Sequence, residues 1–239
     1  MLPKIENELS THLITLPSGK NVNVRKWKVK DKKEFLFKLD KNASKELLRD
    51  VLIQIIKSCI LDPNVDEKFN SLSKVDVVYL FTELRKLSEG DTIDFSFTCG
   101  SCQTLNEDVT INLSDCLKIT NFKDTTISLN NGMIFTIKEI PYLKQIQIEN
   151  TNKDNQIENT LDLMANSIKS FVYENIPYEN FTIEEIKELI QNLDIPDFEK
   201  LLTDITENIG SVFLVAKAVC KNCQKENAIP LGELEDFFQ

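Results

Sequence analysis

Two Cys-x-x-Cys pairs constrain the fold of this chain more than any other feature. The pairs are Cys99–Cys102 and Cys220–Cys223, and a run of alternating apolar and polar residues precedes each one. A second extended stretch follows each pair, so each pair is predicted to form a tight turn between two β-strands. Such a turn, called a knuckle below, directs two sulfur atoms toward one point.

Two knuckles together supply four thiolates, which is the full ligand set of tetrahedral zinc in a closed structural site. The sequence therefore predicts one structural Zn²⁺ in a shared zinc ribbon, with these ligands: Cys99, Cys102, Cys220 and Cys223. A thioredoxin-like redox pair would also contain Cys-x-x-Cys, but such a pair opens a helix, and neither pair here precedes a helical pattern. An Fe–S cluster or a set of unrelated thiols would also be compatible with the four cysteines.

The composition narrows the functional classes. The chain has 239 residues, of which 41% are hydrophobic, and no apolar run reaches the ~18 residues of a membrane-spanning helix. Its start lacks the regions of a signal peptide, so we expect a cytosolic protein with reduced cysteines. A net charge of −10 disfavours nucleic acid and anionic membranes as partners. His12 is the single histidine, which excludes most metal-hydrolase and catalytic-triad chemistry.

The remaining two cysteines have plainer interpretations. Cys59 falls on the apolar face of a predicted helix, where a small buried hydrophobic residue is expected rather than a nucleophile. Cys116 ends the first half of the chain and has no clear chemical role. Neither is predicted to bind metal.

An internal duplication explains why the knuckles lie so far apart. Two hairpins are predicted, with turns at 17–19 and 130–132, and a helical pattern follows each hairpin. The hairpins match at these positions: Leu16, Gly19, Val24 and Arg25 with Leu129, Gly132, Ile137 and Lys138. "IKSCI" at Ile56–Ile60 is paired with "IKSFV" at Ile168–Val172, both on predicted apolar helices.

The next pair of helices gives the firmest match. Ser73 and Asp194 are predicted helix N-caps, with Asp76 and Asp197 in the respective first turns. From these caps to the end of each knuckle the two segments pair without a gap. We therefore expect an α+β fold in which the order hairpin, helix, helix, strand, Cys-x-x-Cys, strand occurs twice.

The predicted boundaries follow these copies. Residues 1–116 form copy one with the first knuckle, and residues 117–239 form copy two with the second knuckle and an apolar C-terminal tail. The copies are expected to be related by a pseudo-twofold axis that passes near the zinc. The metal would then clamp one copy to the other.

Two segments are candidates for binding a partner protein. Lys26 and Lys28 lie in the basic stretch 26–33, which is either the solvated start of a helix or a docking patch for an acidic partner. The tail places three apolar residues at amphipathic spacing: Leu234, Phe237 and Phe238. The tail either folds back on the core or is offered to a partner.

The sequence resembles the T-even-type bacteriophage baseplate protein family. The hairpin carries the first part of the resemblance, through Leu16, Pro17, Ser18, Gly19 and Arg25. A Leu-rich helix that leads into a strand and a knuckle carries the second, through Leu84, Arg85, Leu87, Ser88, Cys99 and Cys102. Zinc binding rests on the cysteines of this chain and is not implied by the resemblance.

The resemblance implies a role in the baseplate hub of a contractile tail, either as an assembly chaperone that is absent from the finished virion or as a permanent minor subunit. The implied partners are other hub proteins, with no nucleic acid, membrane or small-molecule substrate. The protein is expected in the host cytoplasm during assembly, or in the tail baseplate if it is retained. We expect no enzymatic activity. A zinc-ribbon module associated with nucleic acid would also contain two such knuckles.

Overall fold

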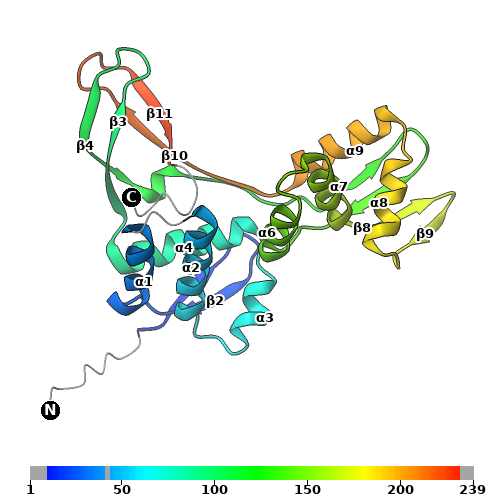
Figure 1. Ribbon diagram of the computed structural model, residues 1–239, viewed down its shortest axis with the longest axis horizontal. Helices are drawn as coiled ribbons and strands as arrows, with labels where there is room; N and C mark the ends of the chain where they lie inside the picture. The colour runs from blue at the N-terminus through cyan, green and yellow to red at the C-terminus, as the bar shows by residue number, and fades with distance from the viewer. Residues whose placement is uncertain (1–9, 41–43, 232–239) are drawn as a thin grey trace. The chain divides into compact units, whose positions relative to one another are not determined.

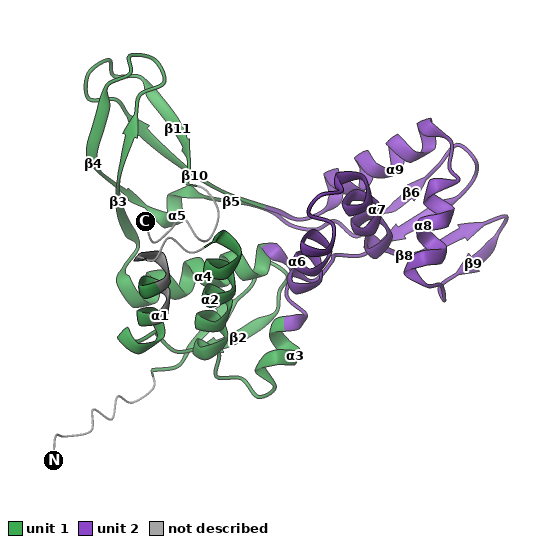
Figure 2. Ribbon diagram, viewed as in Figure 1, with its two compact units in different colours: residues 1–69, 75–119, 212–239 green, residues 70–74, 120–211 purple. Residues whose placement is uncertain are grey.

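The computed structural model describes residues 10–40 and 44–231. Groups of helices lie between groups of strands along the chain, and the strands of the described part form four small sheets (Figure 1). The chain divides into two compact units, coloured separately in Figure 2. Unit 1 comprises residues 1–69, 75–119 and 212–239, and unit 2 comprises residues 70–74 and 120–211. This mixed architecture agrees with the predicted combination of helices and small sheets.

The elements of the first half follow in chain order: β1 (His12–Thr15), β2 (Asn21–Val24), α1 (Val29–Asp40), α2 (Lys45–Cys59), α3 (Val65–Asn70), α4 (Lys74–Glu89), β3 (Thr92–Thr98), β4 (Leu105–Asn112), α5 (Leu113–Cys116) and β5 (Leu117–Thr120). Those of the second half are: β6 (Thr126–Ser128), β7 (Ile134–Ile137), α6 (Tyr142–Thr151), α7 (Gln156–Ser167), β8 (Ile168–Tyr173), β9 (Ile176–Tyr178), α8 (Ile183–Gln191), α9 (Ile195–Asn208), β10 (Ser211–Val219) and β11 (Glu226–Pro230).

The first predicted hairpin is formed by β1 and β2. The backbone N–H of Gly19 donates to the Leu16 carbonyl at 2.8 Å, and Gly19 has a φ of 83°, a left-handed value that glycine adopts without strain. The N–H of Ser18 donates to the carboxylate of Asp76 at 3.1 Å. Asp76 is buried in the first turn of α4, so the turn of the hairpin is tied to the start of that helix.

The second predicted hairpin, β6–β7, makes the same kinds of contact. Gly132 has a φ of 86°, and its N–H donates to the Leu129 carbonyl at 3.2 Å. The N–H groups of Asn130 and Asn131 donate to the two carboxylate oxygens of Asp197, at 2.7 and 3.1 Å. Asp197 is fully buried in the first turn of α9. Each hairpin turn is therefore held by an aspartate at the start of a later helix.

The predicted pairing of Ile56–Ile60 with Ile168–Val172 is wrong. The first segment ends helix α2, whereas the second is most of strand β8. Residues spaced three or four apart fit the apolar face of a helix, but the second segment is rich in β-branched and aromatic residues that pack across strands. In β8, Phe171 lies beside Phe135 of β7 and stacks on Tyr178 of β9, with ring centroids 5.5 and 4.6 Å apart.

The backbone contacts of the hairpins give a different correspondence. The N–H of Arg25 donates to the Cys59 carbonyl at 2.9 Å, and the N–H of Lys138 donates to the Ser167 carbonyl at 2.7 Å. Cys59 and Ser167 are both fully buried at the ends of helices. Ser167, rather than Phe171, therefore occupies the position comparable to that of Cys59.

Unit 2 has its own apolar core. The sheet β6–β7–β8–β9 packs against α7, α8 and α9, with these residues most deeply buried: Ile127, Phe135, Ile137, Met164, Ala165, Ile168, Ile186, Ile190 and Leu201. Strands β10 and β11 belong to unit 1, together with β3 and β4. The predicted limits 1–116 and 117–239 describe repeat copies rather than contacts, and they stay a prediction.

Candidate metal centre

The first knuckle lies between β3 and β4. The N–H of Cys99 donates to the Thr104 carbonyl at 3.0 Å, and the N–H of Gln103 donates back to the Cys99 carbonyl at 3.0 Å. Gln103 has a φ of 58°, a left-handed conformation that reverses the chain directly after Cys102. The strands around the turn are paired in antiparallel register, which fixes both ends of the knuckle.

The second knuckle repeats these contacts between β10 and β11. The N–H of Cys220 donates to the Lys225 carbonyl at 2.9 Å, and the N–H of Gln224 donates to the Cys220 carbonyl at 3.0 Å. Gln224 has a φ of 60°. In Figure 1 the strand pairs β3–β4 and β10–β11 of unit 1 lie side by side with their turns at the same end. The two knuckles therefore face one another.

The four sulfur atoms converge as predicted. The Sγ atoms of Cys99, Cys102, Cys220 and Cys223 all lie within 4.8 Å of one another. Between the knuckles, the Sγ atoms of Cys99 and Cys223 are 3.7 Å apart, and those of Cys102 and Cys220 are 3.6 Å apart. A tetrahedral ion with metal–sulfur bonds of ~2.3 Å separates its ligands by ~3.8 Å, so the spacing of this cluster suits such an ion.

The surroundings of the cluster separate it partly from water. Cys99 and Cys220 are fully buried, and Cys102 and Cys223 are partly exposed. An apolar layer packs beneath the sulfurs, and it consists of Phe95, Phe97, Val109, Ala218 and Ile229. Burial and the thiolate ligand set are typical of a structural metal centre, which leaves no coordination position open for a substrate.

The hydrogen bonds around the sulfurs set their protonation. Backbone N–H groups of Cys102 and Ser101 lower the pKa of Cys99. The side chain and backbone of Thr104 lower the pKa of Cys102 to about 6. The Lys225 N–H acts in the same direction on Cys223, but hydrogen bonds shared with the neighbouring thiols, together with burial, outweigh it and raise the pKa of Cys223 to about 11. A metal binds the thiolate form of cysteine, so metal binding at this cluster is expected to release protons and to depend on pH.

The other two cysteines lie outside this cluster. The Cys59 thiol lies 3.8 Å from the Ser58 hydroxyl at the end of α2, and burial raises the pKa of Cys59. The Cys116 thiol donates to the Asn112 carbonyl at 3.2 Å, and burial raises its pKa as well. Both are buried.

Sequence reasoning missed two residues of the site, Asn106 and Asn227. Each side chain forms hydrogen bonds to the opposite knuckle. A signal for them is present, because "CQTLN" and "CQKEN" share the pattern Cys-Gln-x-x-Asn directly at the second cysteine of each knuckle. The cysteine spacing alone gives no reason to single out an asparagine in the strand that follows.

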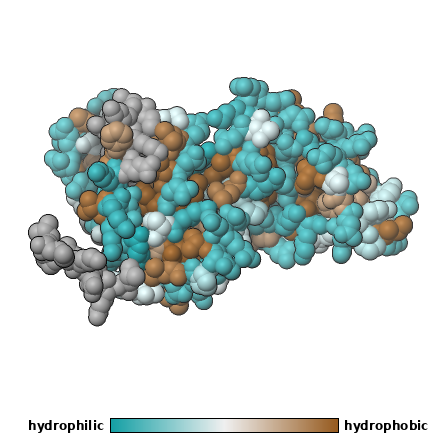
Figure 3. All heavy atoms as spheres, turned by 60° about the horizontal axis from the view of Figure 1, so that its bottom comes forward, coloured by the Kyte–Doolittle hydropathy of each residue, from teal (hydrophilic) through white to brown (hydrophobic). Residues whose placement is uncertain are grey.

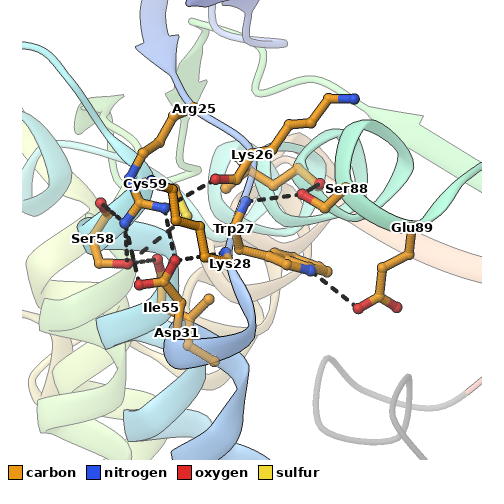
Figure 4. Close-up of polar contacts among 11 residues, drawn as sticks. Arg25, Lys26, Trp27, Lys28, Asp31, Ile55, Ser58, Cys59, Ser88 and Glu89 are labelled. Carbon is orange, nitrogen blue, oxygen red and sulfur yellow. Dashed lines mark hydrogen bonds and ion pairs between the residues drawn. The ribbon is translucent and has the colours of Figure 1, made fainter. Parts of the chain in front are cut away.

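Two residues of the basic stretch, Trp27 and Asp31, form polar contacts with other parts of unit 1 (Figure 4). Arg25 forms an ion pair with Asp31 at 2.7 Å, and both side chains are largely buried. The Trp27 indole N–H donates to Glu89 at 3.0 Å. Trp27 is buried, whereas Lys26 is exposed and Lys28 is half-buried. A partner-binding role for the two lysines stays a prediction.

The predicted tail residues Leu234, Phe237 and Phe238 lie outside the described residues.

The face drawn in Figure 3 is mostly hydrophilic, with smaller hydrophobic patches between the polar residues. In the described part of the chain, no helix has both the length and the apolar character that crossing a membrane requires.

Comparison with known proteins places the chain. A family model described as "T4 bacteriophage base plate protein" matches residues 9–239, which include both hairpins, both knuckles and every helix above. No curated protein and no solved structure matches the chain with statistical significance. The family match confirms the resemblance carried by the first hairpin and by the helix before the first knuckle. The chain belongs to the T4 bacteriophage base plate protein family.

Proposed function

We propose that this protein is a non-enzymatic protein-binding factor in assembly of the baseplate hub, and that it acts as an assembly chaperone. The family match over residues 9–239 carries the proposal, because it supports a place among baseplate components. The mechanism would be transient capping of hub surfaces that otherwise aggregate. The partners would be other hub proteins, met in the host cytoplasm during virion assembly.

The metal has a structural part in this proposal. Zinc is the ion we assign to the four cysteines, because four thiolates at tetrahedral spacing suit it and complete its coordination. Bound there, it would join two strand pairs that are far apart in sequence. No catalytic step is included, since a closed shell of four protein ligands admits no substrate.

Internal duplication is part of the same proposal, and three pairs of matching structural features support it. The two hairpin turns share their glycine conformations, Asp76 and Asp197 accept hydrogen bonds from those turns, and the two knuckles share their backbone bonds. Each pair occurs in the same order along the chain. A frame of two similar halves would offer related surfaces to a partner.

Co-expression with the products of neighbouring baseplate genes tests the chaperone role. A tagged chain is expected to co-purify with one identified hub protein and to raise the soluble fraction of that protein. If no hub protein binds, and none changes in solubility, the proposal is wrong. A Lys26→Glu variant can be tested in the same assay for the predicted docking patch. Lys118→Glu, the same charge change at another exposed lysine, is its control.

A permanent minor subunit of the hub is the second candidate, favoured by the family description as a base plate protein. Quantitative mass spectrometry of purified particles separates the two. A chaperone is absent from particles, and a subunit is present at a fixed ratio to known hub proteins. A nucleic-acid-associated zinc ribbon would instead bind DNA or RNA at low salt, and the net charge of −10 argues against it.

A further inference from the structure

The two asparagines beside the sulfur cluster occupy equivalent places, and the inference built on them rests on the metal centre proposed above. Asn106 lies in β4 and is 1% exposed, and Asn227 lies in β11 and is half-buried. Both follow the second cysteine of their own knuckle in the pattern Cys-Gln-x-x-Asn. Neither asparagine is a metal ligand.

Each asparagine binds the backbone of the other knuckle. The Asn106 Oδ1 accepts a hydrogen bond from the N–H of Lys221 at 2.8 Å, and the Asn227 Oδ1 accepts one from the N–H of Gly100 at 3.0 Å. Gly100 and Lys221 directly follow the first cysteine of each knuckle. Because a glycine and a lysine serve equally, the contact depends on the backbone and not on their side chains.

Each asparagine amide also donates a hydrogen bond to a backbone carbonyl of its own knuckle. The Nδ2 of Asn106 donates to the Thr104 carbonyl at 3.0 Å, and the Nδ2 of Asn227 donates to the Lys225 carbonyl at 3.0 Å. With Oδ1 accepting an N–H and Nδ2 facing a carbonyl, the network fixes the orientation of both amides. Each asparagine therefore bridges the two knuckles through a single rigid group.

The same Nδ2 atoms lie beside the sulfurs of the opposite knuckle. The Asn106 Nδ2 is 3.7 Å from the Cys220 Sγ, and the Asn227 Nδ2 is 3.6 Å from the Cys99 Sγ. An N–H group beside a ligand atom restrains the position of that atom, as outer-shell partners of metal ligands do. Cys99 and Cys220 are the two fully buried members of the cluster, so these donors reach sulfurs that water does not.

We propose that Asn106 and Asn227 form a reciprocal asparagine clamp that holds the knuckles together before metal binds and positions Cys99 and Cys220 for the ion. Ligand groups held in place by their neighbours bind a metal with a smaller ordering cost. The clamp consists only of hydrogen bonds between groups of the chain, so the knuckles are expected to stay paired without metal. Its two members are positioning residues.

Substitutions separate the two halves of this role. Asn106→Asp and Asn227→Asp keep an oxygen that accepts the backbone N–H but lose the N–H donor to sulfur. Asn106→Ala and Asn227→Ala lose both. Gln224→Ala is the control, because Gln224 is an exposed amide residue of the second knuckle whose side chain donates to the Lys221 carbonyl of its own knuckle, at 3.3 Å.

Titration of the metal-free full chain with Co²⁺, followed by its thiolate charge-transfer absorption, measures the effect on affinity. Each alanine variant is expected to bind Co²⁺ about tenfold to a hundredfold more weakly than the wild type, because losing a hydrogen-bond partner of a metal ligand typically lowers metal affinity by that factor. The control is expected to change affinity by less than about threefold. The absorption of the fully loaded variants should still report four sulfur ligands.

Amide hydrogen exchange of the metal-free chain gives the readout that a general loss of stability would not. The N–H of Lys221 should be protected in the wild type and in Asn106→Asp, and exposed in Asn106→Ala. The N–H of Gly100 should respond in the same way to the Asn227 variants. Protection across β6–β9 of unit 2 should stay unchanged in all of them.

The outcomes are distinct. If both alanine variants keep Co²⁺ affinity within about twofold of the wild type, the clamp is overturned and the metal centre stands. If the control loses as much affinity as the clamp variants, the special role of the two asparagines is overturned. If the wild type itself binds no Co²⁺ or Zn²⁺, the metal centre fails, and the positioning role fails with it.

Discussion

The carboxylate of Asp197 accepts the backbone N–H of Asn130 at 2.7 Å, and so joins the first turn of α9 to a hairpin far earlier in the chain. Its second oxygen accepts the N–H of Asn131, and the side chain is fully buried. Hydrogen bonds to a buried charge are worth more than those between neutral groups, since a lost partner leaves a desolvated donor behind. The contact is therefore expected to stabilise unit 2 measurably.

Replacing Asp197 with asparagine tests that contact. Asp197→Asn keeps the size of the side chain but loses the charge and one acceptor, so the free energy of unfolding should fall by about 1.5–3 kcal/mol. Glu199→Gln, an exposed change of the same chemical kind in the same helix, should alter it by less than about 0.5 kcal/mol. Urea unfolding followed by circular dichroism measures both. Equal effects of the two variants would show that the turn contact adds no stability.

The ion pair between Arg25 and Asp31 predicts a pH dependence of stability. Burial would raise the pKa of Asp31, but hydrogen bonds from Arg25 and from the Lys28 N–H outweigh it and hold the pKa below the ordinary 3.8. A carboxyl whose pKa is lowered by folding stabilises the fold above its unfolded pKa, and this contribution is lost as the pH falls through the folded pKa.

Asp31→Asn should therefore destabilise the chain near neutral pH by about 1–3 kcal/mol, and the difference from the wild type should shrink below about pH 4. Urea unfolding from pH 7 to pH 2.5, on metal-free protein so that acid release of metal does not contribute, measures this difference. Asp50→Asn, at an exposed position of α2, serves as the control. A difference that stays constant down to the lowest pH would contradict the role assigned to the ion pair.

Removal of the metal should loosen one part of the molecule. A chelator is expected to speed hydrogen exchange in β3, β4, β10 and β11, because the cluster joins these strands and binding energy adds to the stability of the form that binds. Strands β6–β9, which contain none of the four cysteines, should keep their protection. Added Zn²⁺ should restore the original pattern. Unchanged exchange around the knuckles after chelation would argue against a structural metal.

The exposed Lys26 offers a test of the basic stretch as a docking patch. Once a hub partner is identified, Lys26→Glu should weaken its binding by about threefold to tenfold, mainly through slower association, and the loss should diminish at high salt. Lys118→Glu makes the same charge change at an exposed position of β5 and should have little effect. Equal losses in both variants would indicate net charge alone rather than a local patch.

Much of this architecture is visible in the sequence because its signals are local. Gly19 and Gly132 mark two hairpin turns, Asp194 caps a helix as predicted, and Cys-x-x-Cys requires a tight turn wherever it forms a metal site. The convergence of the four sulfurs follows from a chemical demand, since zinc in a closed site takes four ligands and each knuckle supplies only two. These features need no knowledge of distant contacts.

The features that were missed depend on tertiary contacts. Phe171 fits the apolar face of a helix by its spacing, but neighbouring strands decide its state, because it packs between Phe135 and Tyr178. Asn106 and Asn227 look like ordinary polar strand residues until the opposite knuckle is in place. Extending the comparison of the two Cys-x-x-Cys segments past the second cysteine would have found the asparagines.

The metal content of the freshly purified chain shows directly whether the two knuckles share one ion. We expect about one zinc per chain in the wild type, and close to none in either Cys99→Ser or Cys220→Ser, because each knuckle supplies only half of a four-sulfur shell. Cys59→Ala and Cys116→Ala should keep the full content, since both residues lie outside the cluster. Less than about half a zinc per chain in the wild type, or a metal that survives the loss of one knuckle, would contradict a single ion shared by the two knuckles.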